Sequence, residues 1–123
     1  MSSNHLKSFE QLLKNKKCTQ KFREFLESEY SGENLEFYEA VVGFKKSSDQ
    51  ISSAKVIYDT FIAVGSSREV NIDSLTRNAI KEKLESDGFD LEMFDQAQEK
   101  IYSLMARDSF PRFLQSSQYK GML

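Results

Sequence analysis

The side chains that could carry covalent chemistry are few in this chain of 123 residues. His5 is the only histidine, so a serine or cysteine nucleophile would depend on an imidazole in a polar N-terminal segment. Cys18 is the only cysteine, and we expect it to be a half-buried small hydrophobic residue. The sequence therefore favours a protein that is not itself an enzyme, and we expect no catalytic residue.

Metal and cofactor sites also lack their usual motifs. The chain contains no Cys-x-x-Cys and no His-Glu-x-x-His, and its five glycines are too scattered to form a phosphate-binding or dinucleotide-binding loop. We therefore expect no metal and no cofactor. Acidic residues are plentiful, so a site made of paired carboxylates stays open, although most of them would lie on solvated helix faces.

Polar residues gather instead in three short segments at predicted helix ends. The first contact segment is residues 29–34, the second contact segment is residues 69–73, and the third contact segment is residues 107–112. Surface loops on a rigid scaffold commonly carry binding functions. The three segments are therefore the candidate binding surface.

A purely structural interpretation stays open for each segment, and spacing alone favours it. Ser31 and Asp73 are residue types that cap helix N-termini, and Asn71 fits a turn. Asp108 and Arg112 are spaced i, i+4, so they could simply form a local ion pair worth a few tenths of a kcal/mol.

The elements that must position these segments are helical almost throughout. Apolar residues recur at i, i+3 and i+4, which places them on one face of a helix. The alternation at residues 70–72 is too short for a strand. We predict an all-α antiparallel helical bundle whose terminal helices form a second small layer. The predicted apolar stripes cover residues 6–13, 22–26, 35–42, 54–62, 75–84 and 94–105.

Composition supports an ordinary globular protein. With 39% hydrophobic and 29% charged residues, the chain can build a core, and we expect one domain over residues 1–123. Residues 1–5 are expected to be disordered or left from cloning. The net charge of -2 gives no reason to expect nucleic acid, and no apolar run approaches the roughly 20 residues that span a bilayer.

Three blocks of the sequence resemble regulator of G-protein signalling (RGS) domains. Residues 25–38, FLESEYSGENLEFY, resemble the first signature of the family, and residues 70–73, VNID, match a second block. Residues 97–114, which end in DSFPRFL, match a third block. The resemblance runs from about Phe9 to the end of the chain, in order and with the spacing of the family.

The resemblance implies a bundle of about nine helices that binds a GTP-loaded heterotrimeric G-protein α subunit (Gα). It also implies that the chain accelerates GTP hydrolysis by Gα, with the three contact segments converging at one end of the bundle on the Gα switch regions. The partner-binding residues carried over by position are Tyr30, Ser31, Glu33, Asn34, Asn71, Leu104, Asp108, Ser109 and Arg112.

Two of these residues carry specific roles in the implied mechanism. Asn34 would lie deepest, near the Gα glutamine that orients the attacking water. Asp108 would accept a hydrogen bond from switch I and be steadied by Arg112. Such a GTPase activator binds the transition-state arrangement of the switches better than the ground state, and that difference lowers the barrier.

The chain departs from the family pattern at three positions. Tyr38 stands where tryptophan is usual, and we interpret it as a core position. Gly32 replaces a usually acidic residue, which is expected to loosen the first contact segment, and Phe110 replaces a common tyrosine. The alternative is an RGS-like docking domain without GTPase-activating activity. Because the asparagine and aspartate contacts are present, activity is favoured.

The cysteine content and the basic residues bear on where the protein acts. We expect the protein to act in the cytoplasm, since a lone cysteine forms no internal disulfide. We also expect it to be a monomer. Five basic residues near the N-terminus leave open a weak peripheral association with the inner face of the plasma membrane, although a solvated face is favoured. These residues are Lys14, Lys16, Lys17, Lys21 and Arg23.

Overall fold

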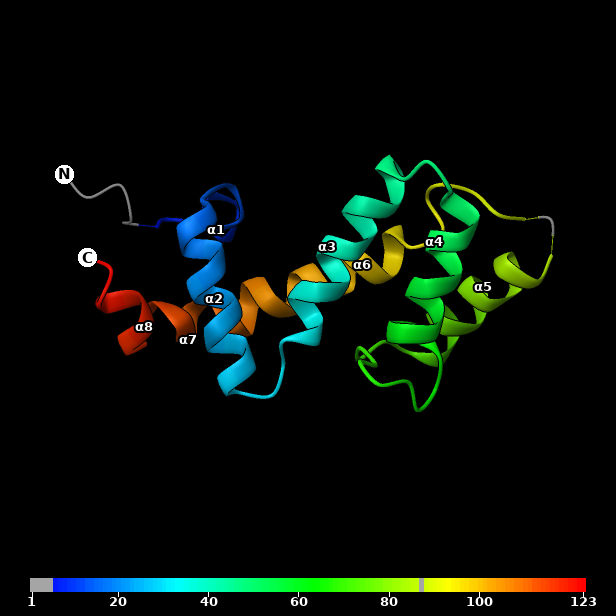
Figure 1. The fold of residues 1–123 in the computed structure, drawn as a ribbon. Helices are drawn as coiled ribbons and strands as arrows, with labels where there is room; N and C mark the ends of the chain where they lie inside the picture. The colour runs from blue at the N-terminus through cyan, green and yellow to red at the C-terminus, as the bar shows by residue number, and fades with distance from the viewer. Residues whose placement is uncertain (1–5, 87) are drawn as a thin grey trace. The chain divides into compact units, whose positions relative to one another are not determined.

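The computed structural model describes residues 6–86 and 88–123 (Figure 1). Within these ranges every regular element is a helix and there is no strand, which confirms the all-α prediction. The predicted disorder of residues 1–5 lies outside the described residues. No helix in the described ranges is long and apolar enough to cross a bilayer.

Eight α-helical and two π-helical segments occur in the described ranges. They are α1 (Phe9–Lys14), α2 (Lys16–Ser28), α3 (Glu33–Lys46), α4 (Gln50–Ile57), η1 (Tyr58–Ile62), α5 (Ser74–Glu85), α6 (Asp95–Leu104), η2 (Met105–Ser109), α7 (Phe110–Leu114) and α8 (Ser117–Lys120).

The prediction of about nine helices is too high for the described part of the chain. Segment η1 continues α4, and η2 joins α6 to α7 without a break, so the helices form seven continuous runs. Pro111 lies inside this continuous run, directly after the π turn in which Phe110 N–H donates to Met105 O. The proline therefore does not separate α6 from α7.

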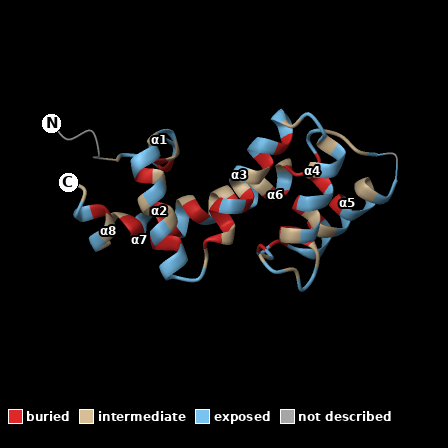
Figure 2. Cartoon of the chain, in the orientation of Figure 1, coloured by how far each residue is buried: buried red, intermediate tan, exposed pale blue. Residues whose placement is uncertain are grey.

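The chain forms two compact units, Met1–Gly32 with Leu104–Leu123 (unit 1) and Glu33–Ser103 (unit 2). The terminal helices α1, α2, α7 and α8 group together in unit 1, and α3 to α6 build unit 2 (Figure 1). The buried residues lie on the inward faces of both sets of helices (Figure 2). Each unit therefore has a core of its own.

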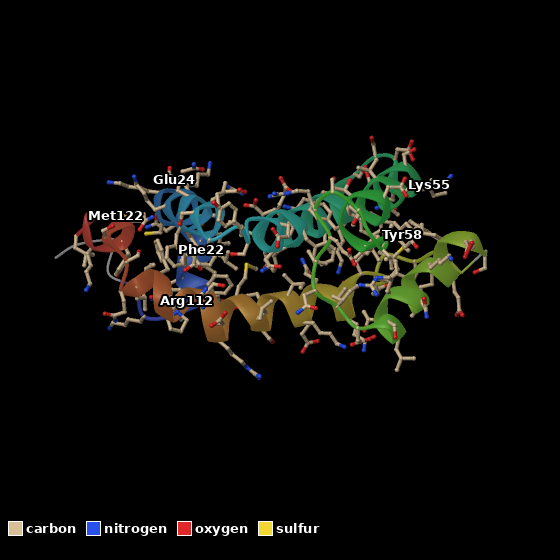
Figure 3. All side chains as sticks on the ribbon, turned by 90° about the horizontal axis from the view of Figure 1, so that it is seen from below. Phe22, Glu24, Lys55, Tyr58, Arg112 and Met122 are labelled. Carbon is tan, nitrogen blue, oxygen red and sulfur yellow. The ribbon has the colours of Figure 1, made fainter. Side chains whose placement is uncertain are left out.

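The core of unit 1 is a cluster of aromatic rings. The Phe22 ring on α2 lies 5.3 Å from that of Phe113 on α7 and 5.4 Å from that of Phe9 on α1, both edge to face. Tyr119 on α8 extends the cluster, with its ring 5.3 Å from that of Phe113. Edge-to-face aromatic pairs add about 1 kcal/mol beyond the area that they bury. This cluster fixes α7 against α2, and Figure 3 labels Phe22 and Arg112 on these two helices.

The core of unit 2 joins α3 to the helices that follow it. Phe44 near the end of α3 is 1% exposed and packs edge to face on Phe94, with ring centroids 5.2 Å apart. Phe37, in the first half of α3, lies 5.6 Å from the Phe61 ring of η1. Since both phenylalanines of α3 are buried, the orientation of this helix is fixed within unit 2.

Tyr38 is half-buried rather than part of the core. Its ring lies 5.8 Å from that of Tyr102 on α6, and its backbone carbonyl accepts a hydrogen bond from Gln98 Nε2 at 3.1 Å. A phenol suits this position, because one side of the ring packs on another aromatic residue while the rest reaches the boundary with water.

Candidate protein-binding site

The first contact segment begins where α2 ends in a Schellman turn. Tyr30 N–H donates to Glu27 O at 3.1 Å, and Ser31 N–H donates to Leu26 O at 2.9 Å. These two hydrogen bonds are the pair that defines the turn, and they place Tyr30 in the left-handed conformation with φ of 60°. Glycine is the usual residue there, and a residue with a Cβ pays about 1–2 kcal/mol.

The consequence of this turn is an exposed tyrosine on a fixed backbone. Tyr30 is 93% exposed, although its backbone is tied to α2. Ser31 is half-buried, and its hydroxyl donates back to Leu26 O at 3.4 Å. Because α3 begins at Glu33, Ser31 is not the N-cap that its residue type suggested. The turn at the end of α2 therefore presents Tyr30 to solvent.

Gly32 is buried beneath the side chain of Glu27. A Cβ at position 32 would overlap the Glu27 carboxylate, so any other residue would push that side chain away. Glycine was expected to loosen this segment, but the space that it leaves is filled by the carboxylate of Glu27. The Glu27 carboxylate thus lies over position 32, although the residue at position 32 is not acidic.

The first turn of α3 carries the next two predicted residues. Glu33 is half-buried, and Asn34 is 7% exposed. In the described residues the Asn34 side chain has no hydrogen-bond partner, yet its polar atoms are not sealed from solvent. An amide that is covered but unbonded can still pair with a partner that reaches it, since leaving it unpaired costs free energy.

The second contact segment presents Asn71 from a tight turn. Its neighbours Val70 and Ile72 are 1% and 7% exposed, whereas Asn71 is exposed. Ile72 N–H donates to Val70 O at 3.1 Å, which is the bond of a γ-type turn centred on Asn71. The two buried side chains anchor the turn and direct the asparagine outward.

The residue that follows this turn fixes the start of α5. Asp73 accepts a hydrogen bond from Thr76 N–H at 2.7 Å, which confirms the predicted N-cap. Its carboxylate also pairs with Lys100 of α6, and Lys100 Nζ donates to Thr76 Oγ1 at 3.1 Å. Hydrogen bonds from Lys100 and Thr76 lower the pKa of Asp73 well below its usual range. The one from Lys100 has the largest effect, and the two from Thr76 come next.

The third contact segment is organised by Arg112. Its Nη1 donates to Asp108 Oδ1 at 2.6 Å, which confirms the predicted i, i+4 ion pair. Its Nη2 donates to Glu29 Oε1, also at 2.6 Å, at the C-cap of α2. These hydrogen bonds raise the pKa of Arg112 above its usual range, and the one to Glu29 has the larger effect. One guanidinium therefore holds two carboxylates from helices that are distant in sequence.

The π turn η2 sets which residues of this segment reach the surface. Phe110 N–H donates to Met105 O, five residues back, where an α-helix would use four. Asp108 is exposed, Leu104 is 36% exposed, and Ser109 is only 3% exposed. Ser109 therefore offers a partner almost no surface in this structure.

The predicted site residues are divided between the two units. Within unit 1, Arg112 is brought to Asp108 and also to Glu29, which directly precedes Tyr30. Glu29 is the residue that sequence reasoning missed, and its only signal was its place in the first polar segment. Unit 1 carries Tyr30, Ser31, Leu104, Asp108, Ser109 and Arg112, and unit 2 carries Glu33, Asn34 and Asn71.

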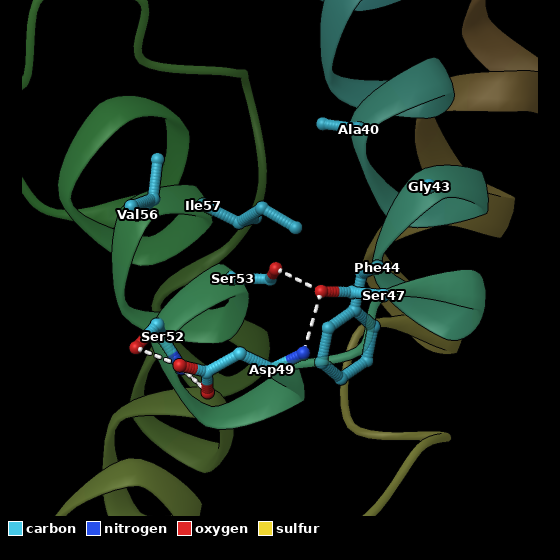
Figure 4. Close-up of a pocket in the computed structure, with 9 residues that line it drawn as sticks. All are labelled: Ala40, Gly43, Phe44, Ser47, Asp49, Ser52, Ser53, Val56 and Ile57. Atoms are coloured by element: carbon cyan, nitrogen blue, oxygen red, sulfur yellow. Dashed lines mark hydrogen bonds between the residues drawn. The ribbon is translucent and has the colours of Figure 1, made fainter.

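A pocket of about 360 Å³ lies apart from these residues, between α3 and α4 in unit 2 (Figure 4). Its polar groups bond to one another: Asp49 N–H and Ser53 Oγ donate to Ser47 Oγ at 3.1 and 2.8 Å. Ser52 donates twice to the Asp49 carboxylate and thereby lowers its pKa. These groups cap α4, and none of the predicted site residues lines the pocket.

The described residues offer little reactive chemistry. Cys18 is fully buried, not half-buried as expected, and burial raises the pKa of its thiol, which keeps it protonated. No group of three or more histidine, cysteine, aspartate or glutamate side chains in residues 6–86 and 88–123 could hold a metal ion. The arrangement instead suits recognition of another protein by preformed polar groups.

Comparisons with known proteins point to one family. The profile described as "Regulator of G protein signaling domain" matches residues 8–122. Regulator of G-protein signaling 8 of Homo sapiens is 45% identical over 119 residues, which cover 94% of this chain and 65% of that protein. Regulator of G-protein signaling 21 of Homo sapiens is 47% identical over 115 residues, covering 91% of this chain and 74% of that protein.

A more distant animal shows the same similarity. Regulator of G-protein signaling rgs-2 of Caenorhabditis elegans is 40% identical over 119 residues, covering 94% of this chain and 69% of that protein. The chain spans just under two thirds of the length of the human and rat regulator of G-protein signaling 8 proteins. Because the family profile covers nearly the whole chain and both of its compact units, the chain belongs to the regulator of G-protein signaling (RGS) domain family.

Proposed function

We propose that this chain is a GTPase-activating module that binds the switch regions of a GTP-loaded Gα subunit and accelerates its GTP hydrolysis. The observation that carries the proposal is the Asp108 carboxylate, which is exposed yet held by Arg112, itself held by Glu29. A carboxylate fixed before binding can accept a hydrogen bond without the entropic cost of ordering its own side chain.

The chemistry remains with Gα. A Gα subunit carries its transition-state arginine in cis, together with Mg²⁺ and the glutamine that positions the attacking water. A helper therefore needs only to bind the transition-state arrangement of the switches better than the ground state. Each tenfold acceleration requires about 1.4 kcal/mol of such preference. This requirement agrees with a chain whose described residues offer recognition groups and little reactive chemistry.

Asn34 and Asp108 have distinct roles in this proposal. Asn34 pairs its amide with the switch glutamine of Gα, and support comes from an amide that is mostly covered but has no hydrogen bond in the described chain. Asp108 accepts a hydrogen bond from switch I. Asn71 and Tyr30, both exposed, add further contacts with Gα. The remaining contacts come from Ser31, Glu33, Leu104 and Arg112, whereas Ser109 is too buried to add one.

The alternative is a docking domain that binds a protein partner without accelerating hydrolysis. Such a domain would use the same segments but would not distinguish the ground state of Gα from its transition state. Asn34 and Asp108 argue against this alternative, because both present groups suited to the switches rather than a plain apolar surface.

Single-turnover GTP hydrolysis by a panel of Gα subfamilies, with and without this chain, tests the proposal. We expect the rate to rise at least tenfold with one or more subfamilies. Asn34→Ala and Asp108→Asn should each remove most of the acceleration, whereas Asn78→Ala, at an exposed position on α5, should not. Binding to Gα without any acceleration across the panel would favour the docking alternative instead.

The remaining assignments are also proposals. We infer a monomeric chain that acts in the cytoplasm as one domain over residues 1–123, with its basic N-terminal residues on a solvated face. Analytical ultracentrifugation tests the first inference. Co-sedimentation with vesicles that contain or lack anionic lipid tests whether the basic residues recruit the chain to a membrane.

A further inference from the structure

Arg77 of α5 joins both ends of the loop that carries Asn71. Its Nε donates to Ile62 O at 2.9 Å, where η1 ends, and its Nη2 donates to Ile72 O at 3.2 Å, directly after Asn71. The Arg77 side chain is only 15% exposed. A mostly covered guanidinium thus spans residues 63–72 from one end to the other.

A carboxylate inside the same loop completes this arrangement. Arg77 Nη2 also donates to Glu69 Oε2 at 3.2 Å, and the other oxygen of Glu69 accepts a hydrogen bond from Gly65 N–H at 2.9 Å. Gly65 has a φ of 79°, a conformation that suits glycine. Through Glu69, Arg77 is therefore also linked to Gly65 in the first half of the loop.

Only an arginine can make this set of contacts. The planar guanidinium presents its N–H groups in a rigid fork that reaches several acceptors at once, whereas a lysine ammonium is a compact point donor on a flexible stem. A lysine at position 77 would keep the charge but would leave at least one of the two carbonyls, Ile62 O or Ile72 O, without its donor. The loop that carries Asn71 would then lose its hydrogen bond to position 77 at one of its two ends.

We propose that Arg77 is a positioning residue for partner recognition, which holds the Asn71 side chain in its binding orientation by clamping both ends of the loop. The inference rests on the proposed function, because it assigns Arg77 an effect on Gα only through Asn71. Arg77 itself, mostly covered and directed at loop carbonyls, does not touch the partner.

A double-mutant cycle in the full chain tests the proposal. The variants are Arg77→Lys, Asn71→Ala and the combination, with Arg68→Lys as the matched control. Arg68 lies in the same loop, but its side chain is 33% exposed and pairs with Glu36. The readouts are single-turnover GTP hydrolysis at saturating chain, thermal unfolding, and hydrogen exchange of the Val70 and Ile72 amides.

We expect Asn71→Ala to lower the acceleration about tenfold and Arg77→Lys about fivefold. The combination should be no worse than Asn71→Ala alone, because Arg77 acts through a side chain that is already gone. Arg77→Lys should also speed exchange of the two loop amides at least tenfold, while Arg68→Lys should change neither readout. Effects that multiply in the double variant, or unchanged exchange, would overturn the proposal.

Glu69→Gln provides the same test with less risk to folding, since the Glu69 side chain is 34% exposed and glutamine keeps its shape. We expect faster exchange of the Ile72 amide and a smaller loss of acceleration that also disappears in the Asn71→Ala background. Hydrogen exchange needs no Gα. If the wild-type chain accelerates no Gα subunit, the proposed function fails while the exchange data still decide whether Arg77 holds the loop.

Discussion

Arg112 and Glu29 form an ion pair of 2.6 Å between α7 and the C-cap of α2, across 83 positions of the sequence. The same guanidinium binds Asp108, so a single cation balances two carboxylates in unit 1. Charge-assisted hydrogen bonds of this kind fix the orientation of the groups that they join. Because solvent screens charges at the surface, the same bonds add little to the free energy of unfolding.

This relationship predicts a functional rather than a structural defect in Arg112→Lys. Lysine reaches one carboxylate instead of two, so Asp108 loses its fixed orientation. We expect the acceleration of GTP hydrolysis to fall about tenfold, with the free energy of unfolding changed by less than about 1 kcal/mol. The measurements are single-turnover hydrolysis and urea denaturation, with exposed Arg107→Lys as the control. A large loss of stability would show that the pair holds the fold instead.

Asn34→Ala is expected to lose at least tenfold in acceleration while its melting temperature stays within a few degrees of wild type. The side chain makes no hydrogen bond within the described chain, so removing it breaks none there. Single-turnover hydrolysis and thermal unfolding monitored by circular dichroism provide the two readouts. Unchanged hydrolysis rates would contradict the role assigned to the amide.

Tyr30→Gly should make the chain more stable and less active. Its φ of 60° destabilises a tyrosine by about 1 kcal/mol but does not strain a glycine. Removing this strain corresponds to a rise in melting temperature of about 4 °C. The exposed ring is lost at the same time, so affinity for Gα should fall. Tyr30→Asn is the companion variant, because asparagine also tolerates this conformation. A lower melting temperature in both variants would rule out strain at this position.

Asp73 predicts how stability depends on pH. Its pKa is lower in the folded chain than in the unfolded chain, so the folded state binds fewer protons and gains stability from the ionised carboxylate. This contribution is complete above about pH 5 and is lost as the pH falls through the folded pKa. Melting temperatures between pH 2 and pH 6 should therefore fall less steeply in Asp73→Asn, which keeps the cap, than in wild type. Asp59→Asn, at an exposed position on η1, should retain the wild-type slope.

The mechanism predicts that the chain distinguishes between forms of one Gα subunit. Binding to Gα with GDP and aluminium fluoride, which imitates the transition state, should be at least tenfold tighter than binding to Gα with GDP alone. Isothermal titration calorimetry measures both affinities. Equal affinities would remove transition-state preference as the source of any acceleration.

Local features of the sequence predicted much of the fold. Helical periodicity identified the helices, the residue type of Asp73 predicted its cap, and the i, i+4 spacing of Asp108 and Arg112 predicted their ion pair. Each of these depends on residues within one turn of a helix, where propensity and spacing dominate. The family resemblance located the contact segments, and the match over residues 8–122 confirmed the family.

The features that sequence could not predict depend on contacts between distant residues. Glu29 gave no sign of pairing with Arg112, and Arg77 gave no sign of reaching Ile62 O, because neither spacing is local. Tyr30 was not predicted in the left-handed conformation, since tyrosine disfavours it and only the Schellman turn imposes it. Ser31 looked like a cap, but α3 begins too late for it to act as one.

The π turn at Met105–Ser109 makes this part of the chain tolerant of a change in length. A π turn holds one residue more than an α-helical turn, because Phe110 N–H donates five residues back rather than four. Deleting exposed Arg107 should therefore return the turn to α-helical spacing and leave Phe113 and Arg112 near their present partners. The same deletion within α6 or α7 would rotate everything that follows by about 100°. Alignments of this chain with its relatives should therefore place a single-residue gap in this stretch rather than in the helices on either side.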